Sequence, residues 1–236
     1  IEETHLLGIS RARGDIVAFL DNDDHWSPNY LESKVNILAN NPEVAVAFSP
    51  YTVFGNSWFG RDMMVRQWLL RPAIRGNRPF DNFANLLRFN NVATFSCFVT
   101  RREFLEDLPS PGSRTLLYDW WVLIQLSMRG LFYCDSTSRT YWRWSKQSTM
   151  GQQAFKSLKE TACAFMEQMY QQVEMDVDKL SAKNVVVYRK YRSVFPLFLD
   201  YYRSPGITKL LRFFVRAPTW AMSSSLSLII NYFKFR

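Results

Sequence analysis

A short apolar run that ends in three carboxylates is the feature that most constrains the fold. Residues 16–20 read Ile-Val-Ala-Phe-Leu, and Asp21, Asp23 and Asp24 follow, with Asn22 between the first two. Such a composition favours a pleated strand, and a run this short is typical of a strand buried on both faces, as in a parallel sheet. The acids would then lie at the carboxyl end of the strand, the edge at which α/β sheets bind ligands.

Two of these acids have a spacing that suits a metal ion. Asp21 and Asp23 are two residues apart, so their side chains can converge on one hard cation at the strand end. Mg²⁺ and Mn²⁺ prefer oxygen ligands, and Mg²⁺ commonly takes one or two carboxylates together with substrate phosphates. The pattern therefore predicts Mn²⁺ or Mg²⁺ as a cofactor.

Three other interpretations of the acidic segment are open. It is compatible with an acidic turn that is simply exposed to water. A calcium loop would use Glu32, which is twelfth counting from Asp21, but Trp26 occupies the sixth position, where that loop needs glycine. A metal-dependent phosphatase of the haloacid dehalogenase type begins similarly, but it would place a small β-branched residue where this chain has His25-Trp26.

Residues 12–32 resemble the central block of the family 2 glycosyltransferases. They match nearly every position of the pattern A-x-G-[DE]-[YI]-[IV]-x-F-L-D-x-D-D-x-[WY]-x-P-x-x-L-E. The resemblance implies an α/β chain with a GT-A-like mixed sheet flanked by helices. It also implies that Asp21 and Asp23 hold the metal that bridges the diphosphate of a nucleotide-sugar, with Asn22 and Asp24 as further donor-binding residues.

A second acidic motif begins at Tyr118-Asp119. Apolar residues follow at helical spacing at Val122, Leu123 and Leu126, so Asp119 lies at a helix start. One interpretation is that this aspartate is an N-cap and nothing more. The motif resembles the family's Glu-Asp-[WY]-x-[LW], in which the aspartate is the general base. By that resemblance Asp119 is the catalytic base, with Tyr118 in place of the glutamate.

Aromatic and basic residues near these acids are candidates for substrate binding. An indole ring covers one face of a pyranose while its N–H remains free to bond. We therefore expect Trp26, Trp120 and Trp121 to bind the acceptor, although the alternative for each of the adjacent pair is a place in the core. Arg143 lies in a segment that resembles the family's closing Y-R-x-[HW] motif. It would face the donor diphosphate, where a fixed positive charge stabilises the leaving group; the alternative is a surface arginine.

The segment after the acids predicts a helix whose apolar stripe is Leu31, Val35 and Leu38. Residues 44–48 then predict a strand. Residues 51–90 are interrupted by glycine and proline. They are interpreted either as a surface excursion or as a loop that shapes the sugar site.

The charge is unevenly distributed and suggests two domains. The chain has a net charge of +8, of which residues 1–150 contribute +1 and residues 151–236 contribute +7. We expect residues 1–150 to be the C-terminal part of a GT-A catalytic domain and residues 151–236 to be a basic amphipathic helical region, with a break near Pro196. Residues 207–236 combine apolar and basic side chains. They can lie in an anionic membrane surface, or they can form a helical subdomain with a solvated basic face.

The start of the chain departs from the family pattern. The resembled enzymes have two or three nucleotide-binding strands before the acids, and Thr4-His5-Leu6 stands where they have Ala-Arg-Asn. We therefore expect the N-terminal nucleotide-binding strands to be missing. The alternative function is then a catalytically incomplete fragment that binds carbohydrate or membrane.

The resemblance to family 2 implies an inverting glycosyltransferase of surface polysaccharide or glycolipid assembly. Its expected partners are a nucleotide-sugar donor and a saccharide or lipid-linked acceptor, and no nucleic acid. No run reaches the ~18–20 apolar residues of a membrane span. The three cysteines are widely spaced, which argues for a reducing compartment. The expected location is cytoplasmic, extending to the inner face of the cytoplasmic membrane.

Overall fold

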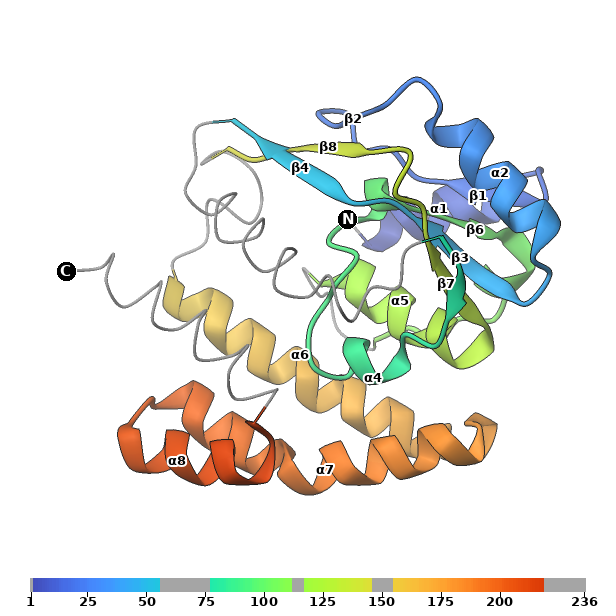
Figure 1. Cartoon of the computed structure of the whole chain (residues 1–236). Helices are drawn as coiled ribbons and strands as arrows, with labels where there is room; N and C mark the ends of the chain where they lie inside the picture. The colour runs from blue at the N-terminus through green and yellow to red at the C-terminus, as the bar shows by residue number, and fades with distance from the viewer. Residues whose placement is uncertain (1, 56–76, 112–116, 146–154, 219–236) are drawn as a thin grey trace. The chain divides into compact units, whose positions relative to one another are not determined.

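The computed structural model describes residues 2–55, 77–111, 117–145 and 155–218. It divides into two compact units, Ile1–Gly151 and Gln152–Arg236. The first unit is α/β, and the second is helical (Figure 1). Much of the excursion expected over residues 51–90 lies outside the described residues.

Two mixed sheets form the framework of the first unit (Figure 1). The larger has the order β1-β6-β3-β7-β5, in which β3 and β7 are parallel and the other neighbours are antiparallel. The smaller has the order β2-β8-β4, in which β8 is antiparallel to β2 and parallel to β4. The strands are β1 Ile16–Ala18, β2 His25–Trp26, β3 Val44–Phe48, β4 Tyr51–Phe54, β5 Pro79–Phe80, β6 Phe98–Arg101, β7 Leu131–Cys134 and β8 Thr140–Arg143.

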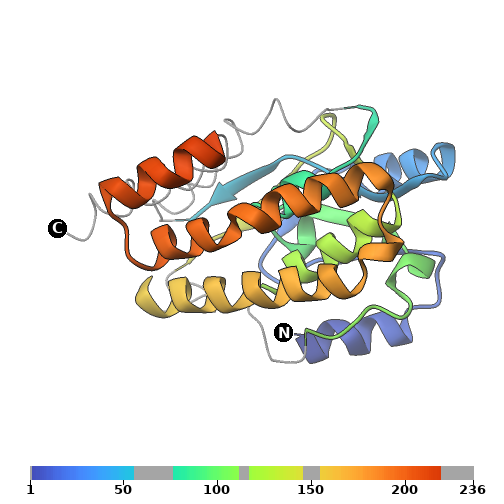
Figure 2. The ribbon, with the colours of Figure 1, turned by 90° about the horizontal axis from the view of Figure 1, so that it is seen from below.

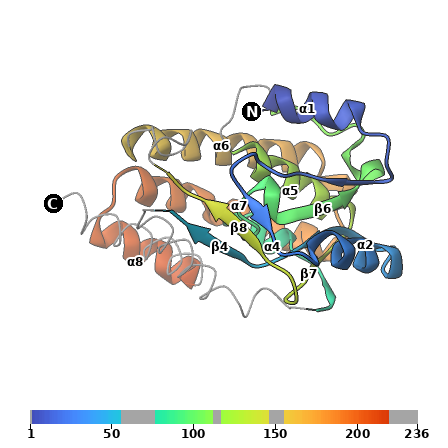
Figure 3. The same cartoon turned by 90° about the horizontal axis from the view of Figure 1, so that it is seen from above.

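Helices flank the larger sheet. Those described in the first unit are α1 Glu2–Arg11, α2 Tyr30–Asn40, α4 Phe83–Leu86 and α5 Tyr118–Arg129, with 3-10 turns η2 Phe95–Cys97 and η3 Arg102–Leu105. Both α2 and α5 pack on β3, and Figure 3 shows the larger sheet between these two helices. Because every residue of β3 is buried, this strand is the centre of the core. The mixed sheets, the flanking helices and the helical C-terminal region confirm the expected GT-A-like fold class.

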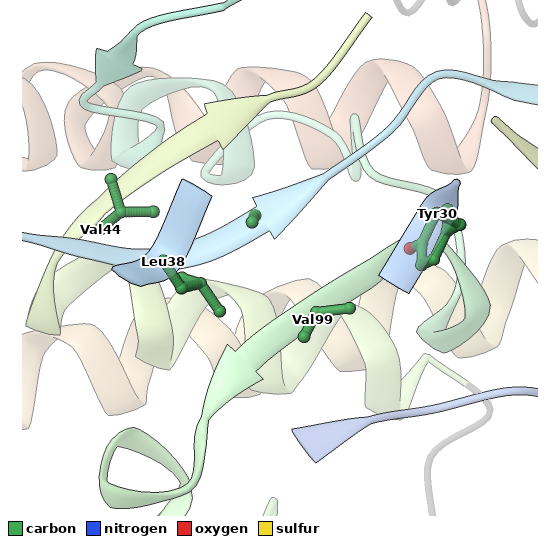
Figure 4. Close-up of a cluster of buried hydrophobic side chains, with 5 residues drawn as sticks. Tyr30, Leu38, Val44 and Val99 are labelled. Atoms are coloured by element: carbon green, nitrogen blue, oxygen red, sulfur yellow. The ribbon is translucent and has the colours of Figure 1, made fainter. Parts of the chain in front are cut away.

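The buried face of α2 differs from the predicted stripe. Leu38 is fully buried, but Leu31 and Val35 are 46% and 42% exposed. The buried residues of the helix are Tyr30, Lys34 and Leu38. Figure 4 shows Tyr30 and Leu38 against residues of β3 and β6. The stripe was assigned wrongly because a lysine occupies one of the inward positions.

The first strand also differs from the prediction. Among the described residues β1 pairs with β6 alone, and the pairing is antiparallel. Val17 is buried, whereas Ala18 is exposed and Leu20 is 50% exposed. The expected strand buried on both faces in a parallel sheet is therefore wrong for the structure described. Here β1 is an edge strand, and the apolar run is longer than the strand it forms.

The second unit consists of helices packed through aromatic side chains. They are α6 Phe155–Met175, η4 Val177–Lys179, α7 Ala182–Arg203 and α8 Ile207–Arg216, and α6 lies beside α7 (Figure 2). Tyr170 of α6 stacks on Phe195 of α7 with ring centroids 4.1 Å apart. Pro196 lies inside α7, so the predicted break is wrong; the helix ends at Arg203. No helix in the described ranges has the length and apolar character needed to cross a membrane.

Candidate functional site

The acidic segment forms a turn between β1 and β2. Asp21 is half-buried, whereas Asn22 and Asp23 are exposed. The backbone N–H of Asp24 donates to the carbonyl oxygen of Asp21 at 3.1 Å, which closes the turn. Two of the predicted site residues, Asn22 and Asp23, are therefore open to a ligand.

Ser96, which the sequence did not identify, anchors this turn. Its hydroxyl accepts the N–H of Asp21 at 2.9 Å, and its carbonyl oxygen accepts the indole N–H of Trp26 at 2.7 Å. The same carbonyl accepts the hydroxyls of Tyr30 at 3.2 Å and Thr140 at 3.1 Å. One residue thus fixes the acidic turn, the start of α2 and the start of β8 relative to one another.

The segment before Ser96 has a left-handed residue that is not glycine. Ala93 has a φ of 85°. Asn90 supports this conformation, because its side-chain oxygen accepts the N–H groups of Val92 and Ala93 and its amide donates to the carbonyl of Ala93. A non-glycine residue at positive φ costs on the order of 1 kcal/mol and persists only where its surroundings impose it. The result places the Thr94 hydroxyl 3.3 Å from a carboxylate oxygen of Asp21, to which it donates.

The carboxylate of Asp24 is buried and makes a hydrogen bond within the fold. It is 9% exposed, and its Oδ1 accepts the backbone N–H of Arg143 at 2.8 Å. Burial raises its pKa to about 6, against the hydrogen bonds from Arg143 and Ser96, which lower it. Asp24 therefore joins the acidic turn to β8. The side chain of Arg143 is exposed.

The structure brings Asp119 close to the acidic turn. It is the second residue of α5, where Leu117 occupies the cap position, and its Oδ1 accepts the N–H of Trp120 at 2.7 Å. The side chain is half-buried. Burial raises its pKa to about 7, and the negative charge of Asp21 adds to this rise against the hydrogen bond from Trp120. A carboxyl with such a pKa can exchange a proton near neutral pH.

The tryptophans that were expected to bind the acceptor lie mainly in the core. Trp120 is 8% exposed and donates to the carbonyl of Leu86 at 2.7 Å, and Trp121 is 2% exposed and donates to the carbonyl of Pro109 at 2.6 Å. Neither ring offers a face to a sugar in this arrangement, so we correct the acceptor-binding expectation for both. Trp26 is half-buried and stacks on Tyr30 with ring centroids 4.5 Å apart.

A buried ion pair, also missed in the sequence, lies between α2 and the β7–β8 connection. Lys34 Nζ is 2.7 Å from Asp135 Oδ2 and 2.6 Å from the hydroxyl of Ser138. Ser33 and Thr137 donate to the same carboxylate. These hydrogen bonds outweigh the effect of burial and hold the pKa of Asp135 well below its usual range. The network fixes the loop that leads into β8.

The donor set at the acidic turn fits a metal that completes its coordination with phosphate. Within the described ranges, no group of three or more His, Cys, Asp or Glu side chains converges as a self-sufficient metal site. Asp21 and Asp23 supply carboxylate oxygens, which are the ligands that Mg²⁺ and Mn²⁺ prefer. Since Mg²⁺ commonly uses one or two carboxylates plus substrate phosphates, these two residues suit a metal bound together with a diphosphate.

Comparison with known proteins gives one family match, in the first part of the chain. No curated protein matches the sequence. Residues 6–108, however, match the family model described as glycosyl transferase family 2. The matched segment contains the acidic turn and Ser96 and ends before Asp119. It confirms the resemblance predicted from residues 12–32: this segment of the chain is similar to glycosyl transferase family 2.

Proposed function

We propose that this chain transfers a sugar, with inversion at the anomeric carbon, from a nucleotide-sugar to a hydroxyl group of a saccharide or lipid-linked acceptor. The family match over residues 6–108 supports glycosyl transfer in general. The observation that carries the finer proposal is Asp119, a half-buried carboxyl near Asp21 whose pKa is raised to about 7. A reaction in surface polysaccharide or glycolipid assembly would supply such acceptors.

Asp119 acts as the general base. Its carboxylate takes the proton of the acceptor hydroxyl while that oxygen bonds to the anomeric carbon, and the bond from this carbon to the diphosphate oxygen breaks with its electron pair. General-base assistance of this kind contributes about 10²–10⁴-fold, most effectively when the pKa lies near the working pH. A single displacement with one base gives inversion and needs no carboxylate nucleophile.

The acidic turn and β8 bind the donor. Asp21 and Asp23 would hold Mn²⁺ or Mg²⁺, which would supply positive charge to stabilise the leaving diphosphate. Asn22 and Arg143 are exposed and would contact the diphosphate oxygens. The hydrogen bond from the Arg143 N–H to Asp24 supports this role, because it holds the strand that carries the guanidinium beside the turn.

Calorimetric titration with UDP, with and without Mn²⁺, tests the donor site. Wild type and Asp119→Asn are expected to bind UDP in a metal-dependent manner, and Asp23→Ala is expected to lose that dependence. Asp119→Asn should then lose about 10²-fold or more of the transfer rate. Asp15→Asn is the matched control, because Asp15 is an exposed aspartate at the other end of β1. Equal transfer by Asp119→Asn and wild type would refute the base assignment, and phosphate release from a simple phosphomonoester would favour a phosphatase.

We also propose that α8 brings the chain to the inner face of the cytoplasmic membrane. Apolar side chains spaced at i, i+4, i+7 and i+8 share one side of this helix and are exposed, namely Ile207, Leu211, Phe214 and Val215. Its charged residues are all basic: Lys209, Arg212 and Arg216. An amphipathic helix of this kind binds anionic lipid through apolar burial and headgroup attraction. The remainder of the expected membrane segment, residues 219–236, lies outside the described residues.

Vesicle co-sedimentation tests this location. The chain should bind vesicles that contain phosphatidylglycerol more tightly than vesicles of phosphatidylcholine alone. Leu211→Glu should weaken that binding by about tenfold, because it places a charge in the apolar face. Val186→Glu is the matched control, since Val186 is 69% exposed on α7. If both variants bind as wild type does, the membrane role of α8 is wrong.

A further inference from the structure

Three aromatic rings gather on one face of the smaller sheet, directly after the acidic turn. His25 of β2 lies opposite Tyr141 of β8, and Phe54 of β4 lies opposite Arg143. His25 stacks on Tyr141 with ring centroids 4.7 Å apart and planes 10° apart, and Phe54 meets His25 edge-on at 5.0 Å. We call His25, Phe54 and Tyr141 the aromatic cluster.

The aromatic cluster is accessible, unlike the tryptophans discussed above. His25 is exposed, and Phe54 and Tyr141 are half-buried. Tyr51, the first residue of β4, points to the other face of the sheet and is only 4% exposed. Val53 and Trp142 on that face are half-buried, whereas the face of the cluster carries the exposed side chains of His25 and Arg143. An open cluster of rings is more informative than scattered apolar residues, because such patches mark binding sites.

Positive charge borders the same face. Since side chains alternate along a strand, Arg143 leaves β8 on the side of Tyr141. Arg139, two residues before Tyr141, donates from its guanidinium to the hydroxyl of Thr52 at 3.1 Å, across the sheet. The face thus combines ring surfaces, polar ring atoms and guanidinium groups. This combination suits an amphipathic ligand with many hydroxyls better than it suits a purely apolar partner.

We propose that the aromatic cluster is the binding site for a pyranose ring of the acceptor saccharide. A pyranose has one apolar face that packs on aromatic rings and a rim of hydroxyls that bonds to polar atoms such as the His25 imidazole and the Tyr141 hydroxyl. The site is continuous with the acidic turn, because His25 follows Asp24, whose carboxylate holds the N–H of Arg143 on the cluster's own strand. A sugar seated there lies beside the donor residues, so this assignment of the acceptor subsite rests on the proposed function.

Saturation-transfer NMR with the methyl glycosides of glucose, galactose and N-acetylglucosamine tests the cluster, without metal or nucleotide. At least one glycoside should receive saturation at its ring C–H protons. Tyr141→Ala and His25→Ala should weaken binding by about tenfold, since each removes a stacking ring. Tyr141→Phe should retain most of the effect. Phe104→Ala is the matched control, because Phe104 is a half-buried ring of η3 outside the cluster.

Every outcome decides the proposal. The proposal is overturned if no glycoside receives saturation from the wild-type chain. It is also overturned if the glycoside signal is as strong with both alanine variants as with wild type. The third contrary result is that the two variants reduce the signal of free uridine and not that of a glycoside. His25→Ala keeps the test valid where Tyr141→Ala fails to fold, because His25 is exposed on an edge strand. A chain that does not bind UDP in a metal-dependent manner would contradict the proposed glycosyl transfer. Sugar binding at the aromatic cluster would still be observed in that case, so the two proposals can fail separately.

Discussion

The acidic turn and the Lys34–Asp135 network use carboxylates in opposite ways. Asp135 is buried among a lysine and three hydroxyls, and its pKa lies well below the usual range. In the acidic turn, no lysine or arginine of the described residues pairs with Asp21 or Asp23, and the pKa of Asp24 is raised. A fully satisfied buried carboxylate stabilises the fold, whereas carboxylates without such partners indicate a binding site. Substitutions in the two regions should therefore act on different measurements.

Removing the lysine should give the largest loss of stability. Lys34→Met leaves the Asp135 carboxylate buried without its cation, which typically costs about 3–5 kcal/mol. Chemical denaturation should show this loss of unfolding free energy, and Lys190→Met, at an exposed lysine of α7, should change it little. A loss for Lys34→Met as small as that of the control would show that the ion pair contributes little.

Neutralising the aspartate of the same pair should remove a source of acid sensitivity. The pKa of Asp135 is lower in the folded chain than its unfolded value of ~3.9, so its contribution is present above pH ~4 and is lost as the pH falls below that value. Asp135→Asn should cost about 2 kcal/mol at pH 7 and progressively less below pH ~4. Denaturation curves at pH 7 and below pH ~4 compare the unfolding free energies of Asp135→Asn and wild type. A loss of stability that does not depend on pH would contradict the prediction.

The corresponding substitution in the acidic turn should have the opposite sign. The folded pKa of Asp24 is about 6, above the unfolded ~3.9, so its favourable contribution is complete below pH ~4 and is lost as the pH rises through about 6. Asp24→Asn should therefore stabilise the chain by about 3 kcal/mol at pH 8 relative to its effect at pH 3, since the pKa rises from ~3.9 in the unfolded chain to about 6 in the folded one. The asparagine oxygen can still accept the Arg143 N–H. If Asp24→Asn instead destabilises the chain increasingly as the pH rises, the predicted contrast with Asp135→Asn is wrong.

Loosening the turn should have the smallest effect on stability and a clearer effect on donor binding. Ser96→Ala removes the acceptor of the Asp21 N–H, at a cost of about 1 kcal/mol. We expect metal-dependent UDP affinity to fall about fivefold while Asp119 retains its titration near pH 7. Ser96→Thr keeps the hydroxyl and should recover the affinity. If alanine and threonine bind UDP equally, Ser96 supports only the fold.

Local patterns were sufficient for part of the fold and of the site. The apolar run of residues 44–48 predicted β3. The acidic motif, by its resemblance, predicted the mixed α/β class and the family that residues 6–108 match. The face of α2 was not predictable, because burial of Lys34 depends on Asp135, which is distant in sequence. Ser96 gave no signal, since its role depends on main-chain positions that only the folded sheet brings together. The burial of Trp120 and Trp121 was not predictable either, because their indoles donate to carbonyls of α4 and of the segment at Pro109, both distant in sequence.

Those two indole anchors have a consequence for Asp119. The first turn of a helix ordinarily frays, because its N–H groups lack partners within the helix. In α5 the indoles of the two residues that follow Asp119 donate to the carbonyls of Leu86 and Pro109, which lie in two separate earlier segments of the chain. The first turn therefore has little conformational entropy left to lose when a substrate arrives. A carboxyl carried on such a turn samples a narrow range of positions, and the ordering that effective proton transfer requires has already taken place during folding.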